Sequence, residues 1–264
     1  MGKLNYKKTL IDSLKFGINP YRWLPLFALD AICMSIIAIY LSSKFGVFIS
    51  LLTSFTSASS MVMGLVGLAL PLVVIVIVCI LLKVWVEGAI IHQANKEKEF
   101  NQSWKVSCSR YPRLFLVMLV ILVLTTVANM IPLAGFVLAI IVGLIFFFPS
   151  QVIMVDDKGA LDSLRKSLDI FKKKPLHVFL VWIIIAIIGG IIAMVFMFPL
   201  TSFLVTKLLE QGGTIGANNI TTLLNALVDN MQDVFIYGVI FLIGASIAKA
   251  FQLKAQTDFY KQLK

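Results

Sequence analysis

Apolar residues run through the chain in six long stretches, each long enough to cross a lipid bilayer. Crossing a hydrocarbon core of about 30 Å takes about 20 apolar residues in an α-helix. The stretches cover, approximately, residues 23–43, 61–86, 114–132, 134–155, 176–205 and 234–253. The second and fifth exceed the minimum, so we expect these helices to tilt or to project beyond the lipid. The pattern predicts an all-α, polytopic membrane helical bundle with about six transmembrane helices.

Polar and turn-forming residues divide these spans into three hairpins. Residues 129–135, between the third and fourth spans, contain both proline and glycine and predict a tight turn rather than one very long helix. A basic, amphipathic segment that ends at a proline precedes each hairpin, at residues 13–20, 107–112 and 167–175. Proline suits the first turn of a helix, where its missing N–H has no partner to lose. These segments therefore predict amphipathic surface helices on the cytoplasmic leaflet, each leading into a span.

The recurrence of this segment suggests internal repeats within a single membrane domain of residues 1–264. The repeat units would be 1–90, 91–156 and 157–264, related about the membrane normal as in the parallel repeats of some transporters. The alternative is that any basic segment entering a membrane from its surface has this composition. The spacing from serine to proline differs among the three segments, and both interpretations stay open.

The connection between the fifth and sixth spans, residues 206–233, carries another amphipathic pattern. Its apolar positions recur with the spacing of one helix face: Ile220, Leu223, Leu224, Leu227, Val228 and Met231. The pattern predicts a helix that lies on the outer surface or caps the bundle. Asn219 begins an Asn-Ile-Thr sequon, which makes it a candidate N-glycosylation site, although such short motifs also arise by chance.

Composition and charge agree with a membrane protein and indicate its orientation. Hydrophobic residues make up 59% of the chain and charged residues only 14%, where a soluble domain would carry about 25%. Of the 23 Lys and Arg residues, 21 flank the spans on the side of the two termini, and only Lys44 and Lys207 lie opposite. Because Lys and Arg accumulate on the cytoplasmic side, we expect a cell-membrane protein with both termini in the cytoplasm.

The same cations are candidate contacts for anionic lipid head groups, which are abundant in the cytoplasmic leaflet. The candidates are Lys7, Lys8, Arg110, Arg113, Arg165, Lys166, Lys172, Lys173 and Lys174. The net charge of +10 is thereby explained by the bilayer, and we expect no nucleic-acid partner. A membrane-protein partner is compatible with the same surface.

Asp30 is the one acidic residue well inside a predicted span. A carboxylate in the membrane is costly and suggests a role in handling a substrate or protons. The alternative is a structural pairing, with Arg22 or with nearby backbone groups, since Asp30 lies only about 10 Å beyond Trp23 along the helix. Glu87 follows Lys83 by one turn and predicts a local ion pair.

Other polar residues give weaker signals. Asn129 closes the third span beside the turn, where a cap or turn role competes with ligand binding. Glycines in the second and fifth spans, Gly64, Gly67, Gly189 and Gly190, predict close approach between helices. The sequence contains no Cys-x-x-Cys pair, Cys/His cluster or nucleotide-binding glycine loop, so we expect no cofactor, no metal and no catalytic residue.

Two segments carry a family resemblance: SLKFGINPYRWLPLFALD, from Ser13, and FFFPSQVIMVDDKGALDSLRKSLDIFKKKPLHVFLVWII, from Phe146. They resemble archaeal and bacterial multi-pass proteins that are similar to the membrane domain preceding the catalytic domain of membrane-bound glycerophosphodiester phosphodiesterases. The resemblance implies a six-helix membrane domain. It carries over no catalytic residue, because the metal-binding catalytic part is missing and the two histidines, His92 and His177, flank spans.

Three functions are compatible with these features. The leading hypothesis is a non-enzymatic membrane scaffold that organises lipid or partner proteins. The alternative is a small transporter or channel with a polar path near Asp30, which would need further polar residues at mid-membrane depth. A lipid-active enzyme is the third hypothesis, because the group of His, Asp or Glu residues that such an enzyme usually has is missing from the sequence.

Overall fold

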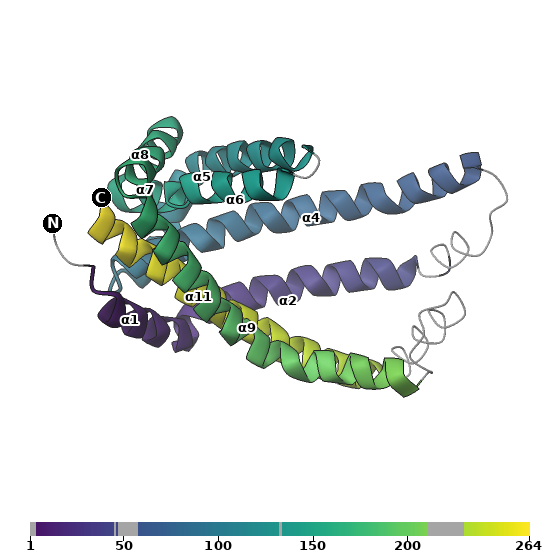
Figure 1. The fold of residues 1–264 in the computed structure, drawn as a ribbon. Coiled ribbons are helices and arrows are strands. Elements are labelled where there is room, and N and C mark those ends of the chain that lie inside the picture. The colour runs from purple at the N-terminus through teal and green to yellow at the C-terminus, as the bar shows by residue number, and fades with distance from the viewer. Residues whose placement is uncertain (1–3, 45, 47–57, 132–133, 211–229) are drawn as a thin grey trace.

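The computed structural model describes residues 4–44, 46, 58–131, 134–210 and 230–264, with the backbone alone for residues 58–65. The elements that its described residues form are α-helices (Figure 1). They are α1 (Tyr6–Ile18), α2 (Pro20–Ser43), α4 (Ala58–Asn95), α5 (Phe100–Asn129), α6 (Gly135–Ile145), α7 (Pro149–Asp156), α8 (Ala160–Lys173), α9 (Pro175–Glu210) and α11 (Met231–Leu263). Six helical segments are long and apolar enough to cross a membrane, which confirms the predicted all-α polytopic bundle.

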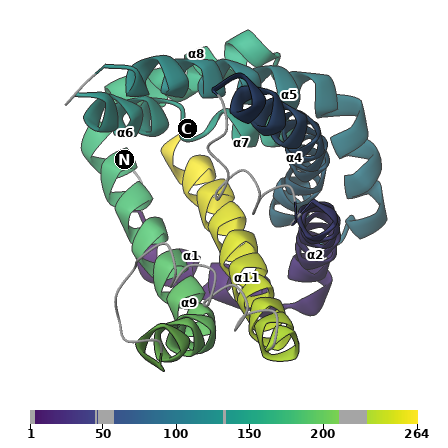
Figure 2. The same cartoon turned by 90° about the vertical axis from the view of Figure 1, so that its right-hand side faces the viewer.

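The long helices run side by side from one end of the molecule to the other. Both termini, α1, α7 and α8 lie at one end, which we call the basic end (Figure 1). From there α2, α4, α9 and α11 extend to the opposite end, whereas the α5–α6 hairpin is shorter. Figure 2 shows the bundle end-on, with α11 between α9 and α2, and α4 between α2 and α5. Both termini at one end agree with an even number of spans.

The fourth span is broken, contrary to the prediction of one continuous helix. α6 ends at Ile145 and α7 begins at Pro149, because proline cannot donate the backbone hydrogen bond that would continue the helix. The buried hydroxyl of Ser167, from α8, satisfies both sides of the break. It donates to the carbonyl of Ile145 at 2.7 Å and accepts the N–H of Phe148 at 3.3 Å. One side chain of α8 therefore serves two backbone groups that the break would leave unpaired.

The three predicted amphipathic segments do not all form separate helices. Two of them form separate helices, α1 and α8, and the prolines that follow, Pro20 and Pro175, begin α2 and α9 as predicted. The middle segment is instead continuous with its span, so that Pro112 lies inside α5. In α8 the buried face contains Leu164, Ser167 and Ile170. Leu161, also in α8, is 64% exposed.

The core is concentrated in the half of the bundle nearest the basic end. The largest fully buried side chains there include Phe251, Phe259 and Tyr260 of α11, which pack with Phe148 and with α9. Towards the opposite end the helices expose apolar side chains such as Leu70 and Phe198. Such exposure is expected of surfaces that face lipid rather than water.

Close approach between α9 and α11 depends on glycine. A Cβ added at Gly189 would collide with Gln252, and one added at Gly244 would overlap the Phe196 side chain. The predicted close contact at Gly189 is therefore present. No described atom would meet a Cβ at Gly190 or Gly67, so the predicted role of those two glycines is wrong. Residues 211–229, with candidate Asn219 and most of the predicted outer helix, lie outside the described residues.

Candidate functional site

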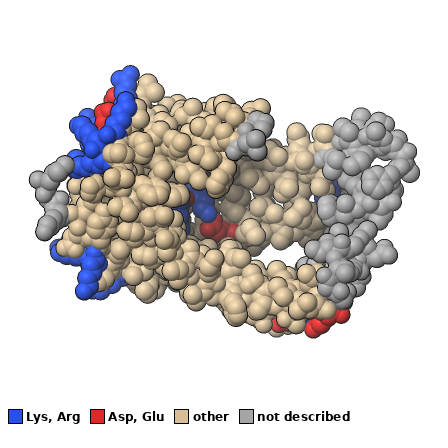
Figure 3. Space-filling model, viewed as in Figure 1, with Lys and Arg blue, Asp and Glu red and all other residues tan. Residues whose placement is uncertain are grey.

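Five of the cations predicted to contact anionic lipid are exposed at the basic end. Lys7 and Lys8 project from α1, and Arg165, Lys172 and Lys173 project from α8. None of the five forms an ion pair with any residue that the structure describes. Figure 3 shows blue side chains grouped at this end of the molecule, above at the position of α8 and below at that of α1. They form two exposed groups of cations, one on each surface helix, and the group on α8 lies among the exposed Asp162 and Asp169.

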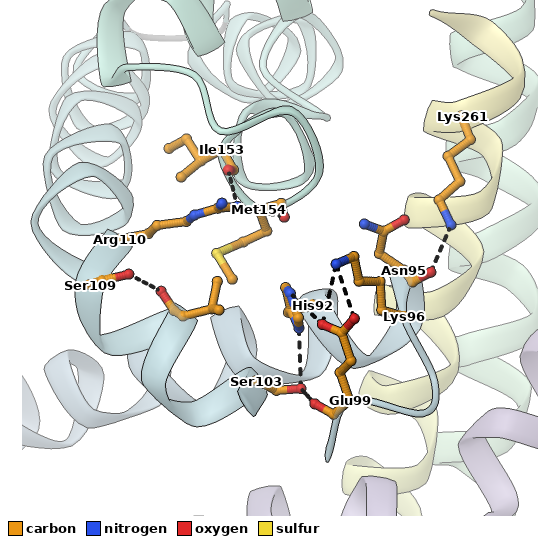
Figure 4. A network of polar contacts seen from close by, with 11 residues as sticks. His92, Asn95, Lys96, Glu99, Ser103, Ser109, Arg110, Ile153, Met154 and Lys261 are labelled. Carbon is orange, nitrogen blue, oxygen red and sulfur yellow. Dashed lines mark hydrogen bonds and ion pairs between the residues drawn. The ribbon is translucent and has the colours of Figure 1, made fainter. Parts of the chain in front are cut away.

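The other four candidate cations have partners within the protein. Arg110 donates to the carbonyls of Ile153 and Met154, at 3.1 and 2.9 Å, at the end of α7 (Figure 4). Asp157 is contacted by Arg110 at 3.1 Å and by Arg113 at 2.8 Å. Lys166 pairs with Asp156, and Lys174 donates to the Leu263 carbonyl at 2.9 Å. Each of the four cations thus holds one element against another. Their charge is therefore used to hold the fold together.

Asp156 collects several of these contacts. Its carboxylate binds Lys166 of α8, accepts the Tyr260 hydroxyl at 2.5 Å and meets Lys264 Nζ at 2.8 Å. Asp156 lies at the end of α7, so this single carboxylate joins α7, α8 and the C-terminal end of α11. Sequence reasoning missed the cluster because Tyr260 and Lys264 are more than a hundred residues away along the chain.

Asp30 is paired, but with a residue that the sequence did not suggest. Lys83 Nζ of α4 donates to both carboxylate oxygens of Asp30, at 2.8 and 3.1 Å. Arg22, the predicted partner, instead donates to Gln93 Oε1 at 2.9 Å and to the Glu97 carbonyl. The predicted local pair of Lys83 with Glu87 is likewise replaced by a pair between helices.

Asn129 and the cysteines offer little that resembles a site. Asn129 is the last residue of α5 and is exposed beside a turn whose residues 132–133 lie outside the described part of the chain. Cys33 and Cys79 are neighbours across α2 and α4, close to Asp30, and both are free thiols, as is exposed Cys108.

Where α4 is followed by α5, His92 of α4, Ser103 of α5 and Glu99 between the two helices are in contact (Figure 4). His92 Nδ1 lies 3.2 Å from Ser103 Oγ, and His92 Nε2 lies 3.9 Å from Glu99. The Ser103 hydroxyl donates to the Glu99 carbonyl at 2.6 Å, so His92 is the donor to Ser103 rather than a base that removes its proton. Both side chains are buried. The network therefore holds the α4–α5 connection in place and does not present an activated nucleophile.

A cavity of about 280 Å³ lies between α4, α5, α7 and α11, next to the break in the fourth span. Its lining contains two polar pairs: Lys249 Nζ with Glu87 at 3.0 Å, and Gln151 Nε2 donating to Gln256 Oε1 at 2.8 Å. Its apolar lining residues include Ile91, Leu114, Val117, Met118, Ile121 and Phe146. The cavity is thus amphipathic, like the molecules of the surrounding bilayer.

Gln151 is the residue that sequence reasoning overlooked. It is 2% exposed, and its Oε1 accepts no hydrogen bond from the described residues. A glutamine inside the predicted span at 134–155 was a visible signal, because polar side chains in a membrane segment are costly. Lys249 and Glu87, at the ends of their predicted spans, resembled ordinary interfacial charges.

Two further hollows lie on the surface of the basic end and share Asn19 and Arg22 among their lining residues. One also contains Lys254, which forms ion pairs with Glu97 at 2.8 Å and with Asp258 at 3.2 Å. None of the three cavities is lined by Asp30. Among the residues described, no group of three His, Cys, Asp or Glu side chains is placed to hold a metal ion.

Comparison with known proteins gives a family without an assigned role. Residues 130–263, just over half of the chain, match the family described as "Domain of unknown function (DUF7847)". No curated protein and no solved structure matches the chain. The resemblance to the membrane domain of glycerophosphodiester phosphodiesterases finds no support in these comparisons. The match begins at the turn before α6 and ends at the last residue of α11, and the chain belongs to this DUF7847 family.

Proposed function

We propose that this chain is a membrane protein that organises anionic lipid through its basic end. The observation that carries the proposal is a set of six exposed cations on α1 and α8, the five named above and Lys15, none of which forms an ion pair with a described residue. Near an anionic leaflet each such side chain contributes about 1 kcal/mol to attraction of the lipid. Both helices lie at the same end of the bundle, so both patches can face one leaflet (Figure 3).

Rigid attachment of the two surface helices supports this proposal. α1 is held against α11 by the Tyr6 and Phe259 rings, whose centroids lie 5.5 Å apart, and by a hydrogen bond of 2.8 Å from Gln262 to Thr9. α8 is held by Ser167 at the break in the fourth span. Cations on fixed helices lose less conformational freedom on binding than cations on a free tail.

The test compares lipids retained around the protein with lipids in the bulk membrane. The chain is reconstituted in vesicles of phosphatidylcholine with one fifth phosphatidylglycerol and extracted in polymer-bounded discs for lipid analysis. We expect phosphatidylglycerol to be enriched at least twofold around the protein and the enrichment to fall in 0.5 M salt, because salt screens exposed charges.

A matched pair of variants separates the basic end from charge in general. Replacing the five cations and Lys15 by glutamine should abolish the enrichment. Replacing Lys44 and Lys207 by glutamine, at the opposite end, should leave it unchanged. Equal enrichment around all three proteins, or none around the original chain, would contradict the proposal.

The transporter hypothesis finds less support. It needs Asp30 to face a polar path, and the Asp30 carboxylate is instead neutralised by Lys83 at 2.8 Å. An ion pair of this kind between two helices is a common way of holding an intramembrane carboxylate. We therefore keep the lipid-organising function as the conclusion.

A further inference from the structure

The α5–α6 hairpin does not reach the end of the bundle where the other long helices stop. Figure 1 shows its turn well short of the ends of α2, α9 and α11. Along α5, Arg113 and the last residue, Asn129, are about 24 Å apart at 1.5 Å per residue. By the same measure, Arg22 and Lys44 at the two ends of α2 are about 33 Å apart. The 11 residues of α6 give about 16 Å, so that both arms of the hairpin fall short of a hydrocarbon core of about 30 Å.

The hairpin also lacks the residues that mark an exit from the membrane. In the sequence, residues 114–155 contain no Asp, Glu, Lys, Arg or His. Where α2, α9 and α11 stop at the opposite end, charged residues follow or close each helix: Lys44, Lys207, Glu210 and Asp233. Tyr and Trp favour the membrane–water interface, and the sequence has neither between Tyr111 and Trp182. The composition of the hairpin is therefore that of a segment surrounded by hydrocarbon.

The turn of the hairpin exposes large apolar side chains. Met130 and Phe136 are 76% and 75% exposed, and Ile131 and Val137 are 47% and 55% exposed. Among the described residues 128–131 and 134–137, Asn129 is the one polar side chain. Contact of these four apolar side chains with water is unfavourable, whereas contact with acyl chains removes that cost. The turn thus fits a partner made of hydrocarbon.

The backbone of the turn is suited to the same environment. Lipid offers no hydrogen-bond partner, so a turn inside the hydrocarbon must satisfy its own N–H and C=O groups. The N–H groups of Met130, Ile131 and Gly135 all donate to backbone carbonyls within the turn, at 3.2, 3.2 and 2.8 Å. A Cβ added at Gly135 would lie 3.0 Å from the backbone of Asn129, so glycine permits the two arms to meet closely. The described part of the turn is therefore compact and hydrogen-bonded.

Beyond the hairpin, α4 continues without α5 beside it. The hydrogen bonds between the two helices join the part of α4 nearer the basic end: Tyr111 donates to the Leu81 carbonyl at 3.2 Å, and Ser107 donates to the Trp85 carbonyl at 2.6 Å. Between residues 66 and 80, all of which the structure describes, α4 buries no residue. Its exposed apolar side chains there include Leu70, at 65%. Lipid therefore surrounds this part of α4.

We propose that α5–α6 is a re-entrant hairpin, which enters the bilayer from the side of the basic end, turns within the hydrocarbon and returns to the same side. Acyl chains of the opposite leaflet cover its apolar turn. The chain then crosses the membrane only through α2, α4, α9 and α11, and both termini stay on one side. This inference does not depend on the binding of anionic lipid by α1 and α8.

The experiment compares single cysteines at the hairpin turn and at the opposite end, in the full chain with its three native cysteines replaced by alanine. Met130→Cys is at the turn, and its matched control is Met231→Cys, a methionine 62% exposed at the start of α11. An impermeant maleimide is added to intact cells and again after the membrane is opened. We expect Met231→Cys to react and Met130→Cys to react at least about tenfold more slowly under both conditions, because maleimide attacks the thiolate and a thiol in hydrocarbon does not ionise. Both should react fully in dodecyl sulfate.

A second measurement identifies what covers the turn. A fluorophore is attached in detergent to the cysteine of Met130→Cys or of Met231→Cys, and each protein is reconstituted with lipids that carry a nitroxide quencher. We expect a nitroxide near the end of an acyl chain to quench the fluorophore at position 130 at least about twofold more than a nitroxide on the head group, and the reverse at position 231. Phe136→Cys, on the α6 side of the turn, repeats both measurements if Met130→Cys does not fold.

Each outcome supports or overturns the proposal. Reaction of Met130→Cys in intact cells at the rate of Met231→Cys overturns it, because the hairpin then emerges on the far side of the membrane. Weak quenching at position 130 by both nitroxides also overturns it, because protein, such as a second copy of the chain, then covers the turn. If Met231→Cys reacts only after the membrane is opened while Met130→Cys stays slow, the re-entrant hairpin is supported and the predicted orientation alone is wrong.

Discussion

The Asp30–Lys83 pair allows the strongest quantitative test of the bundle. At 2.8 Å, and with an effective dielectric constant of about 20, the attraction between the two charges is about 6 kcal/mol. Desolvation of both groups offsets most of this, so we expect a coupling free energy of about 2 kcal/mol. Asp30→Asn keeps an acceptor for Lys83 and should cost about 2 kcal/mol of unfolding free energy. Lys83→Met leaves the carboxylate alone and should cost about 3 kcal/mol.

The double variant separates coupling from the individual losses. We expect it to cost about 3 kcal/mol, less than the sum of the single changes, because neither charge is then left unpaired. Unfolding is followed by circular dichroism in mixed micelles with increasing dodecyl sulfate. The control is Lys207 with Glu210, an exposed pair 3.0 Å apart near the opposite end, where coupling should stay below about 0.5 kcal/mol.

Two results would refute this reasoning. Additive single changes would mean that the two side chains do not meet in the membrane. A different failure concerns function: Asp30→Asn could unfold like the original chain and yet abolish a proton or cation flux into proteoliposomes. That outcome would make the Asp30 carboxylate part of a transport path and would replace the lipid-organising function by the transporter, because an amide cannot titrate.

Three further predictions test packing, the broken span and orientation. Gly244→Ala should lower stability by about 1–3 kcal/mol in the same unfolding assay, since its Cβ overlaps a neighbouring side chain, whereas Gly238→Ala, with open space, should not; equal effects would contradict the α9–α11 contact. Ser167→Ala should cost about 1–3 kcal/mol by leaving two backbone groups at the break unpaired, and a change below about 0.5 kcal/mol would mean that these bonds are dispensable. In intact cells an impermeant thiol reagent should label Lys207→Cys but not Cys108 until the membrane is opened; immediate labelling of Cys108 would reverse the predicted orientation.

Much of the architecture could be predicted from the sequence because lipid imposes simple demands. Long apolar runs must form helices, since a bilayer offers no partner for backbone N–H and C=O groups. The runs therefore predicted the candidate spans, and the distribution of cations agrees with both termini lying at one end. The position of Pro20 and of Pro175 at helix starts followed from the chemistry of the first helical turn.

What could not be predicted depends on tertiary partners. Proline has opposite effects at two positions: α5 continues through Pro112, whereas the fourth span breaks before Pro149. At the break, Ser167 from a later helix satisfies the freed backbone groups, and no local pattern announces that partner. Asp30 was expected to pair within its own helix for the same reason, although its partner lies on α4.

The candidate site was predicted only in its surface part. Charge asymmetry identified the exposed cations, but it could not distinguish Lys172, which is free, from Arg110, which is bound to the end of α7. The cavity could not be predicted, because its polar residues are isolated from one another in the sequence and come from separate helices. Gln151 becomes informative only when α11 brings Gln256 and Lys249 beside it.

The hydroxyl of Ser167 connects α8 to the interior of the bundle. One face of α8 carries exposed cations, and the other is bonded to both ends of the broken span. Phe146 and Phe147, within that break, line the cavity beside Gln151. A tilt of α8 would therefore either break these two hydrogen bonds or move the residues at the break with it. Under the proposed function, contact of lipid with α8 and the position of the break in the fourth span are then coupled in both directions.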